Sequence, residues 1–165
     1  MNASLQNIIQ LSRVEIFDTP TLRVTASVDP YGPPPVTAVN LRANLTKALV
    51  DFKLNGVLTL RTKTGRLENA LYNSTINACA FFRKPSLHRL LYIVQQEVYR
   101  YSDLPTRCPA MPKIYNIRNA SFVNARVPSF LPAAHFRVEV NLLHGNPEKL
   151  ILSTHWYGML KKVKG

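Results

Sequence analysis

Alternating apolar and polar positions run through most of the chain and predict a protein built mainly from β-strands. Four apolar residues share one face of an early predicted strand: Leu22, Val24, Ala26 and Val28. The stretch "DPYGPPP", residues 29–35, should form an exposed loop, because proline lacks the N–H that a central strand needs. Strand-like residues resume at Val36 and continue past Leu45.

The segment 50–60 predicts a hairpin and constrains its register. A two-residue turn at Asn55-Gly56 would mix apolar and charged side chains on one face. A three-residue loop, residues 54–56, instead pairs Phe52 with Leu58 and Val50 with Leu60, so the apolar face is continuous. The loop would hold Gly56 in the left-handed conformation, and we therefore predict this register.

The spacing of apolar residues along the chain changes once, from the period of a strand to the period of a helix. A turn at Thr64-Gly65 should lead into a strand over residues 69–81. Beyond it, six apolar residues follow helical spacing and should form one stripe: Leu87, Leu90, Leu91, Val94, Val98 and Tyr101. Ser86 is the expected N-cap, and Pro105 lies just beyond the expected end.

The last third of the sequence returns to strand patterns. Short strands are expected at 114–117 and 121–124, and a final hairpin turns at "HGNPEK". Its arms alternate at Phe136, Val138, Val140 and Leu142, and at Leu150, Leu152, Thr154 and Trp156. About seven to nine strands with one amphipathic helix predict a mainly β fold. We expect an antiparallel β-sandwich or β-cup with the helix packed over it.

The length is that of one domain, which we expect to span residues 1–165. Within it, 1–35 should hold N-terminal strands and the proline-rich loop, and 36–160 the core of the cup.

The net charge of +12 permits an acidic partner. The basic side chains are nevertheless dispersed: Arg61, Lys63, Arg66, Arg83, Lys84, Arg89, Arg100, Arg107, Arg118, Arg126 and Arg137. Solvation of strand faces explains this dispersal most simply; an anionic membrane surface and then nucleic acid are the alternatives.

Cys79 and Cys108 are the only cysteines and bracket the predicted helix. Without a CxxC motif or nearby histidines they make a poor zinc site, and no motif marks either as a nucleophile. A disulfide from the end of a strand to the loop after the helix is the favoured interpretation, and two free buried thiols are the alternative.

The histidines, His88, His135, His144 and His155, show no metal-binding spacing, although His135 and His155 could face each other across the last hairpin. The sequence contains no GxSxG, P-loop or GxGxxG motif. We therefore expect no enzyme, no cofactor and no metal.

Glycosylation-type triplets begin at Asn2, Asn44, Asn73 and Asn119, and they matter only in a secreted chain. The N-terminus lacks the basic and apolar regions of a signal peptide, so we expect a mature form or an incomplete gene model. Asn73, Asn44 and Asn119 are the candidate glycosylation sites. No apolar run approaches the length of a membrane helix.

An ordered series of motifs resembles a large insect family of secreted domains of unknown function that includes the fly CheB-type chemosensory proteins. The series consists of Asn73 with Thr75, Cys79 with Phe81, the helix, Tyr101-Ser102-Asp103, Cys108-Pro109, Tyr115 with Ile117, and Leu131-Pro132 leading to Phe136. That family is distantly similar to the lipid-recognition (ML-type) β-cup of the ganglioside activator. The sequence departs from the family pattern in three places: it lacks a further N-terminal cysteine pair, has Ala133 after Leu-Pro, and has Asn77 two residues before the first cysteine.

The resemblance implies secretion, a β-cup, and an apolar ligand such as a cuticular hydrocarbon pheromone. Our main hypothesis is a secreted, monomeric, non-enzymatic module that binds a lipid-like or pheromone-like molecule, in a chemosensory role. The alternative is a basic protein that binds nucleic acid or another polyanion without a ligand cavity. Periodicity does not distinguish a filled core from a cavity. If the cavity exists, these residues should line it: Phe52, Leu58, Leu60, Val94, Val98, Phe136, Val138 and Trp156.

Overall fold

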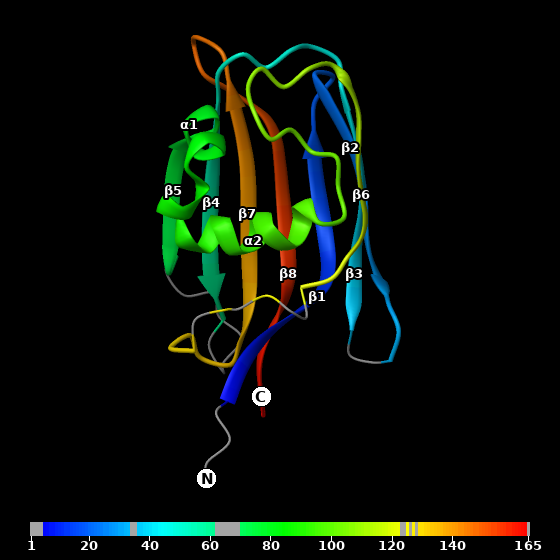
Figure 1. Ribbon diagram of the computed structural model, residues 1–165, viewed down its shortest axis with the longest axis vertical. Helices are drawn as coiled ribbons and strands as arrows, with labels where there is room; N and C mark the ends of the chain where they lie inside the picture. Colours follow the sequence, from blue (N-terminus) through cyan, green and yellow to red (C-terminus); the bar gives the residue numbers. More distant parts are fainter. Residues whose placement is uncertain are drawn as a thin grey trace.

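The computed structural model describes residues 5–33, 36–61, 70–122, 125, 127 and 129–164. Two antiparallel sheets and a helical layer make up this part of the chain (Figure 1). The five-stranded sheet has the order β1 (Leu5–Asp18), β8 (Lys149–Lys164), β7 (Ala134–His144), β4 (Phe52–Leu60) and β5 (Tyr72–Asn77). The three-stranded sheet has the order β2 (Leu22–Pro30), β3 (Thr37–Leu45) and β6 (Lys113–Ala120). The predicted mainly β, antiparallel sandwich is confirmed.

A helical layer lies across the five-stranded sheet (Figure 1). It consists of α1 (Ala78–Arg83), the short 3-10 helix η1 (Pro85–Leu87) and α2 (Arg89–Tyr99). A Cβ added to Gly56 in β4 would lie 3.5 Å from Cδ2 of Leu91. The absence of a side chain at Gly56 therefore lets α2 come close to the sheet.

The register determines which side chains lie beneath the helix. Leu58 of β4 pairs with Val138 of β7, which pairs with Trp156 of β8. Successive residues of a strand point to opposite faces, so the even-numbered residues of these strands share the inner face. The predicted β7–β8 hairpin is confirmed, with an irregularity between Leu142 and Leu143.

The predicted loop at 54–56 is wrong, because β4 runs without interruption from Phe52 to Leu60. Gly56 pairs with Ser74 on one side and Val140 on the other, and it is not among the residues with positive φ. Cross-strand hydrogen bonds, not a turn, use the Asn55 side chain. Phe52, Leu58 and Leu60 of the predicted apolar face still share one face, because they keep the same parity in a continuous strand. Val50, the fourth residue of that predicted face, precedes β4 and is 69% exposed.

The strand predicted at 69–81 is shorter, because β5 ends at Asn77. The Asn77 side-chain oxygen accepts a hydrogen bond from the Ala80 N–H at 2.9 Å and caps α1, so Phe81 is helical. Ser86 is not the N-cap of the main helix: it lies in η1, and α2 begins at Arg89 after His88. The turn predicted at Thr64-Gly65 lies outside the described residues.

Two further boundaries differ from prediction. Pro30 belongs to β2 and pairs with Thr37, which an edge strand permits because its outer N–H positions need no partner. The loop therefore starts at Tyr31, and residues 34–35 of the predicted loop are not described. One strand, β6, replaces the two predicted after the helix; Ser121 and Phe122 lie beyond it, and 123–124 are not described.

The apolar side chains form two clusters, one at each end of the sandwich. The first, the closed end, lies near the start of β4 and β8. Its buried members are Leu22, Val24, Ala43, Leu45, Leu49, Phe52, Ala78, Cys79, Ala110, Tyr115, Ile151 and Leu152. The second, the helix end, has as its buried members Leu11, Val39, Ile117, Ala120, Leu131, Phe136 and Leu160.

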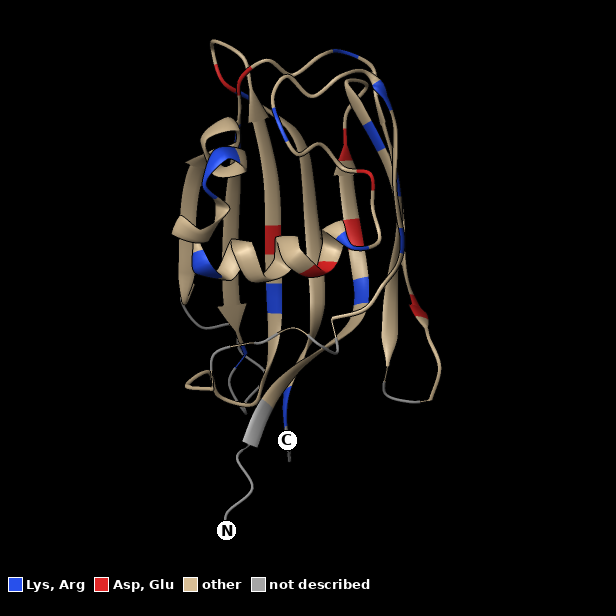
Figure 2. Cartoon of the chain, viewed as in Figure 1, with Lys and Arg blue, Asp and Glu red and all other residues tan. Residues whose placement is uncertain are grey.

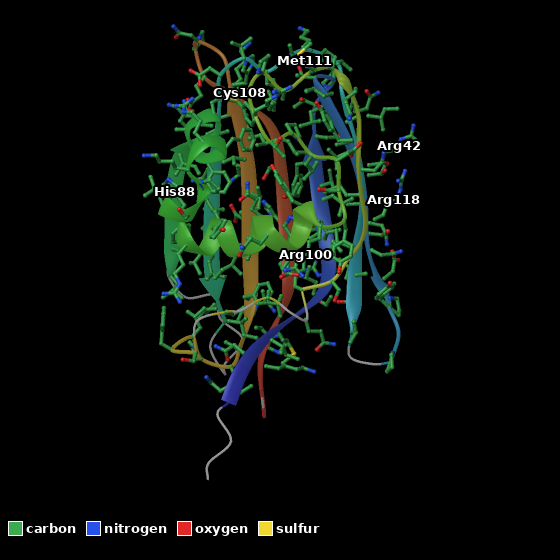
Figure 3. The ribbon with its side chains drawn as sticks, in the orientation of Figure 1. Arg42, His88, Arg100, Cys108, Met111 and Arg118 are labelled. Carbon is green, nitrogen blue, oxygen red and sulfur yellow. A yellow bond between two sulfur atoms is a disulfide. The ribbon has the colours of Figure 1, made fainter. Side chains whose placement is uncertain are left out.

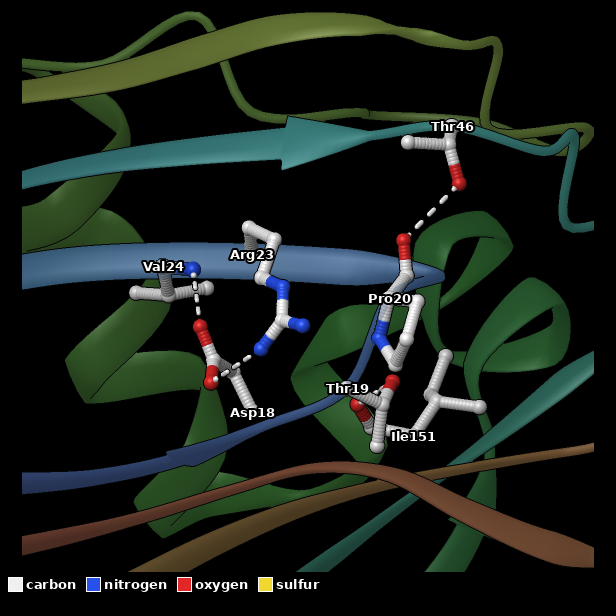
Figure 4. A network of polar contacts seen from close by, with 7 residues as sticks. All are labelled: Asp18, Thr19, Pro20, Arg23, Val24, Thr46 and Ile151. Atoms are coloured by element: carbon white, nitrogen blue, oxygen red, sulfur yellow. Dashed lines mark hydrogen bonds and ion pairs between the residues drawn. The ribbon is translucent and has the colours of Figure 1, made fainter.

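Polar contacts connect the two sheets at the closed end (Figure 4). In the turn from β1 to β2, the Thr19 hydroxyl donates to the Ile151 carbonyl of β8 at 2.7 Å. The Thr46 hydroxyl, just after β3, donates to the Pro20 carbonyl at 3.2 Å. Asp18 accepts the Val24 N–H at 3.0 Å and an Arg23 N–H at 3.2 Å. These contacts hold the corner where the chain passes from one sheet to the other.

Candidate ligand-binding site

Six of the eight predicted cavity residues belong to the helix end. Phe136 is one of its buried members, and five others pack against it while remaining partly exposed: Leu58, Leu60, Val98, Val138 and Trp156. They come from β4, β7, β8 and α2, so the predicted convergence of the sheet and the helix is present in the structure. We call these six residues the inner apolar surface.

Phe52 and Val94 lie apart from that surface. Phe52 belongs to the closed end, where its ring meets that of Phe82 at 6.0 Å between centroids. Val94 is 39% exposed on α2 and is in neither cluster. Helical spacing assigned Val94 to the apolar stripe. It did not determine which residues of that stripe face the sheet.

The polar atoms beside the inner apolar surface already have partners. Trp156 Nε1 donates to Thr154 Oγ1 at 2.8 Å, and Thr154 Oγ1 donates to the Val140 carbonyl at 3.2 Å. On α2, the Tyr99 hydroxyl donates to the Pro105 carbonyl at 2.5 Å, and burial raises the pKa of Tyr99 to about 12. The indole ring of Trp156 can therefore contact an apolar molecule without losing a hydrogen bond.

Five of the six residues of the inner apolar surface are only partly buried. None of the larger side chains in the described part of the chain is fully buried. Leu58, Val138 and Trp156 of the inner apolar surface are half-buried.

A different hollow, of about 290 Å³, lies at the closed end beside the β7–β8 turn. Its lining is largely polar and includes Asp51, Lys53, His144 and Glu148. Lys53 and Glu148 form an ion pair at 2.9 Å, and the hydrogen bond that Lys53 donates to Glu148 raises the pKa of Lys53. An exposed ion pair of this kind suits a solvated surface better than an apolar ligand.

The outer face of the five-stranded sheet carries a ladder of polar side chains. Asn55 donates to Thr75 at 3.0 Å, Asn141 donates to Asn55 at 2.9 Å, and Ser153 donates to Asn141 at 2.5 Å. His155 Nε2 lies 3.3 Å from Ser153 Oγ. Because Ser153 gives its only proton to Asn141, this arrangement is a cross-strand ladder and not an activated nucleophile.

His135 and His155, which could have faced each other across the last hairpin, do not pair. His155 pairs across the strands with Glu139 and Glu15, whereas His135 pairs with Met159. The His155 ring instead lies 4.9 Å from the ring of Phe17. Among the described residues, no group of three or more His, Cys, Asp or Glu side chains could hold a metal ion.

The disulfide between Cys79 and Cys108 is confirmed. It joins the first turn of α1 to the loop before β6, at the closed end. Such a bond is consistent with an extracellular protein.

The candidate glycosylation residues Asn44, Asn73 and Asn119 are all exposed, and Asn2 lies outside the described residues.

Sequence reasoning missed several residues of the helix end. Leu104, Phe122 and Val127 pack against its buried members and come from the connections that flank β6. Loop residues follow no periodic pattern, so no signal in the sequence marked them. Arg42, which was not among the dispersed basic residues named from the sequence, is exposed beside Arg118 on the three-stranded sheet (Figure 3).

The family model described as a protein of unknown function (DUF1091) matches residues 55–138, which is 84 of the 165 residues. The matched part begins in β4 and ends in β7, so it includes the disulfide and the whole helical layer. The comparison with curated proteins found no match. No helix in the described ranges is both long enough and apolar enough to span a bilayer.

Proposed function

The chain belongs to the DUF1091 family, and we propose that it is a secreted, non-enzymatic module that binds one lipid-like or pheromone-like molecule between α2 and the five-stranded sheet. The observation that carries the proposal is the half-buried state of the inner apolar surface, although its residues face inward. An apolar ligand placed there would remove that surface from water, at about 25 cal/mol per Å² before ordering costs.

The chemistry of the surface favours an extended hydrocarbon over a polar molecule. Its lining consists of Leu, Val, Phe and Trp side chains, and the nearby polar atoms of Trp156 and Tyr99 have intramolecular partners. The motif series resembles that of CheB-type chemosensory proteins, which supports a ligand of the pheromone class. The disulfide and the exposed asparagine triplets support secretion.

Val98→Trp tests this proposal, because Val98 is half-buried in α2 and packs against the helix end. In an open cup the larger ring fills free space, so the melting temperature should hardly change while uptake of a fluorescent fatty-acid probe is abolished. The matched control is Val24→Trp at the closed end, where Val24 is 6% exposed. That change should overpack a sealed core and cost about 1–3 kcal/mol while leaving probe uptake intact.

The proposal is wrong if the wild-type chain takes up no apolar probe and Val98→Trp destabilises as much as Val24→Trp. Mass measurement of the secreted protein adds an independent check on localisation. Loss of mass on glycosidase treatment, removed by Asn73→Gln, would support passage through the secretory pathway.

A further inference from the structure

Three large apolar side chains of the helical layer face solvent. Leu87 is 73% exposed, Val94 39% and Tyr101 40%. The sequence pattern predicted all three to share a buried stripe, but the register of α2 directs Leu91 and Val98 toward the sheet instead. Val94 lies within α2, Tyr101 lies two residues beyond its end, and Leu87 ends η1, separated from α2 by His88. We call these three residues the apolar ridge.

Cations surround the apolar ridge. Arg83, Lys84, Arg89 and Arg100 are exposed, and the ion pairs found in the described part of the chain all use other cations. Figure 2 shows Lys and Arg at both ends of the helical layer. Glu97, the only acidic residue of α2, is 5% exposed. The helical layer therefore presents positive charge around apolar side chains and almost no negative charge.

We propose that the helical layer docks on an anionic lipid bilayer. Leu87, Val94 and Tyr101 would enter the headgroup region, where burial of apolar surface is favourable. The four cations would remain at the level of the lipid phosphates and carboxylates, to which they are attracted. Interfacial binding needs apolar side chains and cations on one surface, and the helical layer carries both.

Charge distinguishes an anionic bilayer from the other two partners that could cover the apolar ridge, a second copy of the chain and nucleic acid. A second copy of the chain would bring two sets of four cations together, which is unfavourable. Nucleic acid would satisfy the cations but would offer little to an exposed Leu87 and Val94. An anionic bilayer is the partner that satisfies both the charge and the apolar side chains.

Docking in this orientation has a consequence for the proposed ligand site. Because α2 covers the sheet at Gly56, the bilayer would lie against the element that covers the inner apolar surface. Lipid could then pass between membrane and cup at the edge of α2. This consequence rests on the proposed function, whereas the docking itself does not.

The test is flotation with vesicles of phosphatidylcholine alone or with about 30% phosphatidylserine. The wild-type chain should bind the anionic vesicles, bind the neutral ones weakly, and dissociate as salt rises, because salt screens exposed charges. Arg89→Gln with Arg100→Gln should weaken anionic binding by about 30-fold, since each cation near the surface contributes about fivefold.

Matched controls exist on the opposite side of the molecule. Arg42 and Arg118 project from the three-stranded sheet, away from α2 (Figure 3), so Arg42→Gln with Arg118→Gln removes the same charge from another surface. That control should bind within about threefold of the wild type. Val94→Asp should abolish binding, whereas Ile114→Asp should not, and both side chains are 39% exposed. Melting temperatures should show that all four variants fold.

Three results would overturn the proposal. Equal losses in both arginine pairs would mean that diffuse net charge drives binding. Wild-type binding by Val94→Asp would mean that the apolar ridge plays no part. A concentration-dependent dimer that Val94→Asp dissociates would assign the ridge to a second copy. Probe uptake without vesicles reports on the ligand site separately, so either proposal can fail while the other stands.

Discussion

At the closed end of the sandwich, twelve buried residues are accompanied by seven partly buried apolar ones, whereas at the helix end seven buried residues are accompanied by eleven. The difference follows from what holds each end together. The closed end has the Cys79–Cys108 disulfide, the bridge between Leu49 and Ala110, and the hydrogen bonds of Thr19 and Thr46. At the helix end, α2 meets the sheet through side chains such as Leu91 and Val98.

The two ends differ in how completely their apolar side chains are buried. The disulfide lies at the closed end, where more of the apolar side chains are buried, whereas polar contacts between distant segments occur at both ends. Regions with fewer sealed apolar contacts open at a lower free energy, and binding elements are drawn from such regions. We therefore expect the two ends to respond differently to equivalent changes.

Removing the disulfide should give the largest effect. Replacing both Cys79 and Cys108 by Ala frees a loop with a sequence separation of 29 residues. By the chain-entropy estimate, the free energy of unfolding should fall by about 3–4 kcal/mol. Urea unfolding of the double variant measures this loss, and reduced wild-type protein provides the control.

Probe uptake by that double variant sharpens the comparison. Well below its melting temperature, uptake should persist, because the inner apolar surface lies away from the disulfide. Loss of uptake in a variant that remains folded would show that the two ends are not independent.

Truncating one leucine at each end compares the packing directly. Leu45 is 4% exposed at the closed end, and Leu58 is half-buried at the helix end. Leu45→Ala should cost about 3 kcal/mol, whereas Leu58→Ala should cost about 1 kcal/mol because less surface is lost from the core. Only Leu58→Ala should weaken uptake of the fatty-acid probe. Equal costs in urea unfolding would contradict the distinction between a sealed and an accessible cluster.

Much of this fold was predictable from alternation, and the failures have physical causes. The β7–β8 hairpin was predicted because its apolar residues keep one parity through both arms. β1 was missed because its register shifts between Leu11 and Arg13, so the apolar positions change parity from Ile9 and Leu11 to Val14 and Ile16. At Asn55-Gly56 a strong turn signal was overridden by tertiary structure, since Gly56 is where α2 approaches β4.

The candidate site was predictable only in part. Strand parity placed Leu58, Val138 and Trp156 on one face, and the structure brings them together. The position of Val94 depended on the rotation of α2 about its own axis, which packing against the sheet determines and periodicity does not. The disulfide was predicted because two cysteines at the ends of one helical segment had no metal-binding companions.

Acid should have the smallest effect, and it should act where Asp18 of β1, Asp29 of β2 and Asp103 before β6 contact the three-stranded sheet. The pKa of Asp18 is lowered chiefly by the Val24 N–H, that of Asp29 by the Ser27 hydroxyl and then Asn40, and that of Asp103 by the Asn116 N–H. A lowered pKa in the folded state means that each carboxylate stabilises the fold above its ordinary value near 3.8, and that this contribution disappears as the pH falls further. The melting temperature should therefore be steady above about pH 5 and decline below about pH 4.

Asp18→Asn tests the assignment, because it removes one of these carboxylates while keeping the shape of the side chain. The variant should melt below the wild type at pH 7 and approach it as the pH falls, since protonation already removes the charge from the wild-type Asp18. The effect should be modest, because the Arg23 side chain is 58% exposed and solvent screens its interaction with the half-buried Asp18. Hydrogen exchange at acid pH should show the amides of β2 and β6 losing protection before those of β7 and β8. The opposite order would mean that the acid-sensitive contacts hold the five-stranded sheet instead.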